Sequence, residues 1–506
     1  MSSIEKLRYN ATWYYMALVF AVLPLFFVNM YFNISQEKWL CFILCTIVYF
    51  FIMALSYIFD ENVQDSLKAI GKNWGVTEYA MLAFFVVTVI STLFSSDKYA
   101  SLTGNEARYN GLANIFAYFF VFIMVRKHYF NARSIVILLT TIGALVSTTA
   151  VCQYLTWDPI GMYKGVTVQS VHRMISTIGN RNIYASFLSI ILPLTIYLYI
   201  SCDDLKKRIV YGIFLAIGFA GGIAGNSDSF YIGVAAGLSI MIAAGGLTSN
   251  NFKRIPQALA WGCLGDYLIL MAAHILRDKG ADIRPSQGIT AYFTDNTTHM
   301  LIIFLILAAI SAILAFIPKS KNPEDPLLGK KGRLTATIIF LSVICCIVFW
   351  ALVSFPFPDA FGSYRGFIWR LALEDFTKLS FFKQLFGYGP ETLLNVYNSK
   401  YHDEMVGVTG VIYDNVHSEP LEYLVTTGIL GFLAYMILVI SLVYRLYKTA
   451  KSDKGAYLYL VPVFAYFAQS FVNIAQSATT PIYFLLIALA IGHLQPDKVK
   501  NLNAEE

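Results

Sequence analysis

The sequence predicts an all-α protein that crosses a membrane about fourteen times, and two observations support this: the composition and the long apolar runs. Of the 506 residues, 57% are hydrophobic and only 13% are charged, about half the charge of a typical soluble protein. The apolar residues gather in runs close to the roughly 20 residues that cross a bilayer. These runs are too long and too unalternating for barrel strands, whereas helices satisfy their own backbone hydrogen bonds in lipid.

Fourteen runs qualify as membrane spans. They cover residues 12–32, 39–59, 77–94, 111–125, 133–155, 182–200, 208–224, 229–246, 256–276, 298–317, 334–354, 421–445, 456–473 and 478–494. The runs 208–224 and 229–246 are separated only by Gly225-Asn226-Ser227-Asp228. Either a tight outward hairpin or a broken helix fits this spacing.

The distribution of Lys and Arg predicts the orientation of the chain. The formal net charge of +6 comes from cations in short tracts between the apolar runs, which is a topology signal and not a nucleic-acid signal. With the N-terminus inside, every inward loop holds at least two cations, so we expect both termini in the cytoplasm. The polar segment 356–420 then faces outward, between a bundle of eleven spans (1–355) and three final spans (421–506).

Cysteine and carboxylate patterns exclude some chemistry. None of the seven cysteines lies in 356–420, so disulfides do not hold that segment together, and no Cys/His spacing resembles a zinc site. The outward segments have no Asp-x-Asp pair of the kind that holds Mg²⁺ for sugar nucleotides. The chain also lacks the phosphate-binding loop of ATP-dependent enzymes. We therefore expect no metal and no other cofactor.

The densest polar constellation is the stretch 413–423, Tyr-Asp-Asn-Val-His-Ser-Glu-Pro-Leu-Glu-Tyr, where the outward segment re-enters the membrane. Its histidine, His417, lies near a helix N-terminus with carboxylates at Asp414, Glu419 and Glu422. A histidine in that position can act as an acid, a base or an anion ligand. The alternative interpretation is that the polar residues only cap the following helix, with Pro420 in its first turn.

A second group contains Arg365 and Trp369, which are four residues apart and therefore share one face of a predicted amphipathic helix over 364–379. A guanidinium group beside a bilayer is suited to bidentate phosphate binding. Contact with ordinary lipid head groups is the alternative.

Two further outward stretches add cations. Arg108 lies in 101–112, before the fourth span, and Arg181 lies in 176–185, where Asn180 either caps the sixth span or points into a cavity. Several cations on one face indicate an anionic ligand such as a lipid pyrophosphate.

These motifs resemble those of the O-antigen ligase/polymerase family. The resemblance rests on Gly-Tyr-Gly-Pro-Glu-Thr at 387–392, Asp-Asn-Val-His at 414–417, Thr-Gly-Ile-Leu-Gly at 427–431, Arg-Gly-Phe-Ile-Trp at 365–369, Gly-Asn-Arg-Asn at 179–182 and Arg-Tyr-Asn-Gly-Leu at 108–112. It implies a metal-independent helical glycosyltransferase of type C-like fold. Such a protein transfers a glycan from undecaprenyl pyrophosphate to an acceptor hydroxyl on the outer face of the bacterial cytoplasmic membrane.

The resemblance also implies roles for individual residues. Arg365 would bind pyrophosphate, and His417 would assist acceptor activation or the leaving diphosphate. The family often has an arginine in the stretch matching 226–230, where this chain has none, so we expect Arg108 or Arg181 to supply the second phosphate ligand. The family commonly has Asn after the histidine, where this chain has Ser418. The residues expected to support the site are Asp414, Glu419, Asn180 and Trp369.

The acceptor stays open at this point: a glycan, a lipid or a protein each fits, and so do a ligase and a polymerase. The expected partners are the carrier-linked donor, this acceptor and membrane lipids, with no nucleic acid. A flippase or other transporter for lipid-linked oligosaccharides is the rival hypothesis. It is disfavoured because charged residues within the spans are scarce, with Asp266 standing out, whereas transport paths usually contain intramembrane polar groups.

Overall fold

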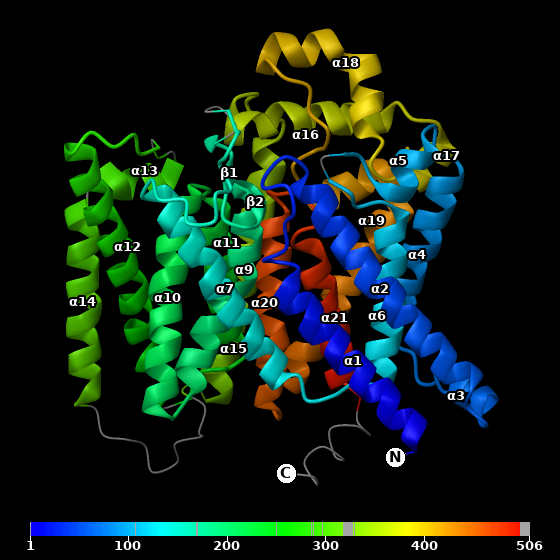
Figure 1. Ribbon diagram of the computed structural model, residues 1–506, viewed down its shortest axis with the longest axis horizontal. Coiled ribbons are helices and arrows are strands. Elements are labelled where there is room, and N and C mark those ends of the chain that lie inside the picture. Colours follow the sequence, from blue (N-terminus) through cyan, green and yellow to red (C-terminus); the bar gives the residue numbers. More distant parts are fainter. Residues whose placement is uncertain are drawn as a thin grey trace.

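A computed structural model describes residues 2–106, 108–167, 171–248, 250–284, 286, 288–295, 297–316, 327 and 329–495. The described chain is mostly helical, with two short strands (Figure 1). All fourteen apolar runs form helices. They are α1 (Ser3–Val22), α2 (Ile34–Ile58), α4 (Val76–Leu93), α6 (Leu112–Lys127), α7 (Arg133–Tyr154), α9 (Arg181–Ser201), α10 (Leu205–Gly225), α11 (Ser229–Ala243), α12 (Arg254–Asp278), α14 (Thr297–Ala315), α15 (Lys330–Ser354), α19 (Glu419–Thr449), α20 (Tyr457–Ser470) and α21 (Thr480–His493).

Eight of the helices in the described residues are long and apolar enough to cross a membrane: α2, α4, α7, α9, α10, α12, α14 and α19. This confirms an all-α protein of the multi-spanning membrane class, while the count of fourteen spans stays a prediction. The first run is displaced from its expected bounds of 12–32. Helix α1 starts early because Ser2 and Glu5 form a capping box, and it ends before Pro24, which cannot continue a helix.

The junction at 225–228 separates two helices. Asn226 takes a left-handed conformation (φ 49°) that ends α10, and α11 begins at Ser229. Both helices pack on α9, whose most apolar stretch is completely buried. Helix α9 is therefore at the centre of the bundle.

Shorter elements connect the long helices. They are α3 (Val63–Lys68), α5 (Lys98–Thr103), α13 (Gly288–Asp295), α16 (Phe361–Thr377), α17 (Phe381–Phe386), α18 (Leu393–Thr409), a 3₁₀ turn η1 (Lys454–Ala456) and two short strands, β1 (Met174–Ile175) and β2 (Gly179–Asn180). The strands pair antiparallel, with Met174 opposite Asn180 and Ile175 opposite Gly179. Helices α16, α17 and α18 lie at the end of the molecule opposite the N-terminus (Figure 1).

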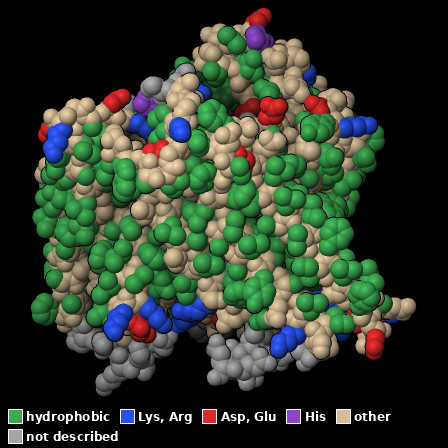
Figure 2. All heavy atoms as spheres, in the orientation of Figure 1, with side chains coloured by type: hydrophobic (Ala, Val, Ile, Leu, Met, Phe, Trp, Pro, Cys, Tyr) green, Lys and Arg blue, Asp and Glu red, His purple; other side chains and the backbone are tan. Residues whose placement is uncertain are grey.

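Hydrophobic side chains cover the middle of the molecule on the face shown in Figure 2, and Lys and Arg side chains gather at the end that holds the N-terminus. At the opposite end, α16 to α18 have a small core of their own. It contains Phe367, Ile368, Leu371, Ala372, Tyr388, Leu393, Tyr397, Met405, Val416 and Val425. Burial of these side chains gives the polar segment a defined shape.

Two glycines allow the α17 turn to dock on α19. Gly387 (φ 75°) and Gly428 (φ 72°) have left-handed backbones, and Gly428 kinks α19. A Cβ on Gly428 would lie 2.2 Å from the carbonyl oxygen of Leu385. The close approach lets Tyr388 N donate to Val425 O (3.1 Å). Only glycine fits both positions without strain.

Candidate functional site

Four of the expected site residues meet at the polar end of the bundle. Arg108 comes from the loop before α6, Arg365 from the start of α16, and Asp414 and His417 from the segment before α19. We call these four residues the outer site. Its two arginines are both tied to residues 471–479, the α20–α21 loop: Arg365 Nε donates to Val472 O (3.0 Å), and Ser477 N donates to Arg108 O (3.2 Å).

Arg108 and Asp414 form an ion pair. Nη2 of Arg108 lies 2.8 Å from Oδ1 of Asp414, and the two side chains are only 12% and 17% exposed. Burial raises the pKa of Asp414, but the charge and hydrogen bond of Arg108 outweigh this and hold the pKa below its usual range. Asp414 is therefore ionised at neutral pH, and it neutralises part of the charge of Arg108.

His417 is held in a left-handed backbone conformation (φ 56°). Its backbone N–H donates to Oδ1 of Asn415 (2.8 Å), and its ring packs edge-on against Tyr413 with ring centroids 5.2 Å apart. Burial, followed by the positive charges of Arg108 and Arg365, lowers the pKa of His417 to about 4, and Asp414 opposes the shift. The imidazole is therefore neutral at pH 7 and can accept a proton.

Arg365 is partly buried, and its side chain bonds backbone carbonyls. In addition to Val472, its guanidinium bonds Gly362 O through Nη1 (2.5 Å), because Gly362, Ser363 and Tyr364 all adopt left-handed backbones at the start of α16. Trp369, on the same face of α16, donates from Nε1 to Val416 O (3.0 Å). The two side chains thus flank the segment that carries His417.

Capping does not account for the polar residues before α19. Ser418 is the residue before the helix, but its side chain makes no capping hydrogen bond. Asp414 pairs with Arg108, and Asn415 accepts from His417. Glu419 is only 1% exposed and accepts from the hydroxyls of three tyrosines, Tyr435 (3.1 Å), Tyr466 (3.2 Å) and Tyr423 (3.3 Å). Glu419 therefore joins α19 to α20 at the start of α19, just after His417 in the sequence.

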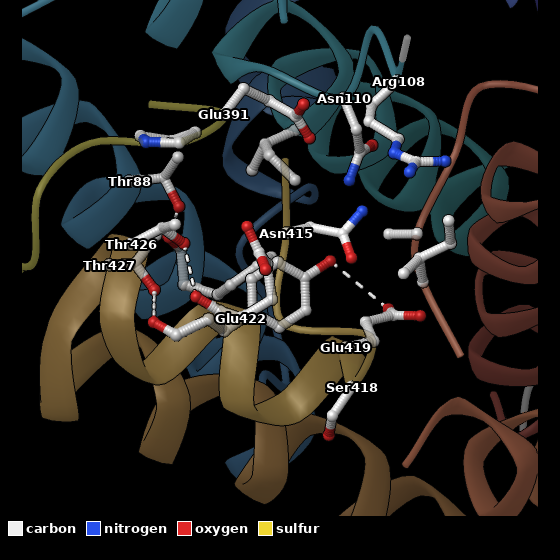
Figure 3. A pocket seen from close by; sticks show the side chains of 16 residues that line it. Thr88, Arg108, Asn110, Glu391, Asn415, Ser418, Glu419, Glu422, Thr426 and Thr427 are labelled. Atoms are coloured by element: carbon white, nitrogen blue, oxygen red, sulfur yellow. Dashed lines mark hydrogen bonds between the residues drawn. The ribbon is translucent and has the colours of Figure 1, made fainter. Parts of the chain in front are cut away.

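A pocket with about 510 Å³ of empty volume lies beneath the outer site (Figure 3). Glu391 and Glu422 extend into it from opposite sides, with Arg108 nearby (Figure 3). Glu391 has a left-handed backbone (φ 60°). Burial raises the pKa of its carboxyl to about 8, against the opposing charge of Arg108 and with the help of Asp414. Glu391 is therefore largely protonated at neutral pH.

The sequence analysis gave no role to Glu391 or Glu422. Glu422 was noted only as a carboxylate near His417, and Glu391 only as part of the Gly-Tyr-Gly-Pro-Glu-Thr motif. Nothing in the local sequence indicates that these two side chains converge, because the chain between them passes through all of α18. The left-handed backbone of Glu391 is visible only in the structure.

Arg181 lies outside the outer site. Asn180 caps α9 through a hydrogen bond from Asn182 N (2.8 Å). The neighbouring backbone N–H of Arg181 donates to Arg173 O (3.1 Å), and the charges of Arg173 and Arg284 act on the Arg181 side chain. A link to the outer site runs through the α20–α21 loop, because Asn473 Nδ2 donates to Asn182 O (2.7 Å).

The described residues contain no group of three or more His, Cys, Asp or Glu side chains that could hold a metal ion. Fold and site together define a multi-spanning helical membrane protein with arginines and a neutral histidine gathered at one polar end.

Comparison with known families makes this class more specific. Residues 288–436 match the family model described as O-antigen ligase, a range that includes Arg365, Trp369, Asp414 and His417. This region is therefore similar to the O-antigen ligase family, in agreement with the resemblance of its motifs. No curated protein matches the chain.

Proposed function

We propose that this protein transfers a glycan from undecaprenyl pyrophosphate to an acceptor hydroxyl on the extracytoplasmic face of the bacterial cytoplasmic membrane. The main support is the meeting of Arg365, Arg108 and a neutral His417 at one polar end of a membrane bundle. A diphosphate is already an activated leaving group, so such an enzyme needs positive charge, orientation and a proton acceptor.

Each group of the outer site then has one task. Arg365, which bonds backbone carbonyls and no carboxylate among the described residues, offers its guanidinium to the diphosphate. Arg108 is already paired with Asp414. Its main contribution is therefore positive charge near the diphosphate, and less a set of free hydrogen-bond donors. His417 accepts the proton of the acceptor hydroxyl, and the imidazolium that forms is stabilised by the neighbouring diphosphate.

The atoms balance in a single displacement. The acceptor oxygen forms a bond to the anomeric carbon as the bond from that carbon to the diphosphate oxygen breaks, which inverts the configuration. The electron pair leaves with the carrier diphosphate, and the proton goes to His417. No metal is required for this step, because arginines stabilise the developing negative charge.

The test is a complementation experiment in cells that lack the native gene. Arg365→Ala and His417→Ala are expected to abolish the surface glycan or glycoprotein, while protein levels in the membrane stay normal. Arg370→Ala is the matched control: it lies on the same helix, but its guanidinium pairs with Asp359 (3.3 Å) and Glu374 (3.4 Å). Wild-type glycan levels in both site variants would refute the assignment.

Reconstitution separates the enzyme from a flippase. Carrier-linked glycan supplied only on the outer side of sealed vesicles would be consumed by a transferase, with release of carrier diphosphate. A flippase would only redistribute it across the bilayer. Redistribution without new glycan product would overturn the proposed function.

A further inference from the structure

A second cluster of arginines lies beside the outer site, and the function proposed above makes no use of it. We call Arg173, Arg181 and Arg284 the hairpin arginines. Arg173 precedes β1, Arg181 follows β2 at the start of α9, and Arg284 comes from the segment between α12 and α13. Strands β1 and β2 lie at the same end of the molecule as α16 and α18 (Figure 1).

Arg284 is buried with an unused donor. Its side chain is 7% exposed. Nη2 donates to the Tyr163 hydroxyl and to Met174 O (3.1 Å), and the guanidinium lies 5.7 Å from the centre of the Tyr163 ring. Nη1 is buried and has no hydrogen-bond partner among the described residues. A buried donor without a partner is energetically unfavourable, so this position is suited to a ligand that brings an acceptor.

The cluster opens outward. Arg173 is exposed, Arg181 is partly buried and Arg284 is buried, so the three guanidinium groups lead from the surface into the protein. The antiparallel hairpin and the bond from Arg181 N to Arg173 O hold the first two arginines at adjacent positions.

The positive charge of two of the hairpin arginines has no acidic counterpart among the described residues. In the described part of the chain, no carboxylate forms an ion pair with Arg173 or Arg284. The carboxylate of Asp158 acts on Tyr163, but its oxygens already accept from Tyr163 N (2.7 Å) and Gln153 Nε2 (3.2 Å). Planar guanidinium groups without a carboxylate partner bind phosphate in bidentate fashion.

Tyr413 connects the hairpin arginines to His417. Its ring packs on His417, and its hydroxyl feels the positive charges of both Arg365 and Arg173. The Asn473–Asn182 bond joins the start of α9 to the loop that holds Arg365. Tyr413, the ring that packs on His417, is therefore within reach of the charges of both clusters.

We propose that the hairpin arginines bind the phosphate-bearing head group of a lipid-linked acceptor, while the outer site binds the donor diphosphate. This inference rests on the proposed transferase function and extends it to the acceptor class. A lipid with a phosphate or diphosphate head, such as a second carrier-linked glycan, then places its hydroxyl near His417, next to Tyr413. A protein acceptor has no group that requires this site.

The test counts bound carrier on the intact protein in nanodiscs of phosphatidylcholine, with undecaprenyl pyrophosphate as the probe and native mass spectrometry as the readout. Wild type is expected to bind two carriers. Arg284→Gln and Arg173→Gln should each weaken one of the two sites about tenfold or more, the loss of roughly one charge-assisted contact. Arg365→Gln should weaken the other. Arg173 is exposed, so its variant tests the site without disturbing the fold.

Control arms identify the source of the phosphate. Lys164→Gln removes one exposed positive charge from the same outer segment and should leave two carriers bound. Equal competition by phosphatidylglycerol would show a general lipid contact, and complete filling by inorganic pyrophosphate would show a soluble ligand; either result overturns the inference. A single bound carrier that only Arg365→Gln removes overturns it too, with the proposed function intact. Two bound carriers insensitive to Arg365→Gln would instead contradict the proposed function.

Discussion

Left-handed backbone conformations concentrate around the outer site. His417, Glu391 and Tyr109 have φ values of 56°, 60° and 52°, and none of them is glycine. Each such residue costs of order 1–3 kcal/mol and persists only where its surroundings hold it in place. At His417 the Asn415 side chain and the packing on Tyr413 supply that hold. The imidazole is thus presented by a strained turn and not by a regular helix.

The pH dependence of carrier binding tests the role of His417. Its pKa is about 4 in the free protein, and a bound diphosphate should raise it, so binding takes up a proton. The affinity for undecaprenyl pyrophosphate should therefore increase as pH falls from neutral toward 4, and more steeply for wild type than for His417→Gln. Titration of the diphosphate itself is common to both proteins. Equal slopes by equilibrium binding would show that His417 does not face the ligand.

The raised pKa of Glu391 should make the stability of the folded protein depend on pH. Its carboxyl pKa is about 8 in the folded protein against an ordinary value of 4.5, so between these values the folded state keeps a proton that the unfolded state releases. Stability from this group is complete below pH 4.5 and is lost as pH rises to about 8. Thermal unfolding of Glu391→Gln between pH 5 and 8 should lose that decline. An unchanged pH profile would contradict the prediction.

At the scale of elements, the contact between α17 and α19 holds residues 387–389 against the bundle. The bond from Gly389 N to Thr426 O (2.9 Å) joins the turn after α17 to the kinked part of α19. The same stretch of α19 lines the pocket that contains Glu391 and Glu422. The position of the pocket walls therefore depends on this docking.

Gly428→Ala should break the docking. The new Cβ would lie 2.2 Å from Leu385 O, at a backbone φ of 72° that side chains rarely adopt. We expect glycan transfer to fall at least about tenfold and the α17 turn to become sensitive to protease, since strain of ~1–3 kcal/mol or more is added. Gly407→Ala on α18, which meets nothing within 4 Å, should leave both properties unchanged. Equal behaviour of the two variants would argue against a docking role.

The positions of the long helices along the chain could be predicted well from the sequence. Apolar runs locate helices because lipid permits no other structure for such segments, and all fourteen runs are helical. Exact ends depended on local chemistry, as the shift of α1 toward Ser2 and away from Pro24 shows. The β1–β2 hairpin had no signal of its own: each strand is two residues long, which is too short for an alternating pattern.

The residues of the site could be predicted from the sequence only in part. Arg365, Asp414 and His417 share the polar segment 356–420, so their motifs indicated a common place, and Arg108 was expected nearby because its loop was predicted to face the same side. Arg181 was expected with them as well, yet it lies with Arg173 and Arg284. Which of several arginines on one face share a cavity depends on helix packing, and the sequence of a single chain does not reveal it.

On the scale of the whole molecule, the two ends contain different polar clusters. At the end opposite the outer site, Glu78 of α4 is fully buried and pairs with Arg126 (3.0 Å) and Arg445 (3.0 Å). The three residues join α4, α6 and α19. The same three helices provide residues of the pocket or its approach at the other end, so this ion cluster fixes the frame without touching the site.

Glu78→Gln should therefore separate stability from binding. Removal of the buried carboxylate breaks its ion pairs with Arg126 and Arg445, a loss of about 3–5 kcal/mol, and the midpoint of thermal unfolding should fall clearly. Carrier affinity measured at a temperature where the variant is folded should stay at the wild-type value. Asp65→Asn, which breaks an exposed pair with Lys68, should change neither quantity. Weakened carrier binding in folded Glu78→Gln protein would show that the two ends are coupled.

The α20–α21 loop also sets an order of assembly during biosynthesis. The ribosome makes Arg108, Arg365 and His417 well before it reaches Val472 and Ser477, the residues whose backbone groups anchor the two arginines. A nascent chain that has inserted every helix up to α19 still lacks those anchors. Both arginines of the outer site therefore gain these backbone partners only when residues 471–479 join the bundle.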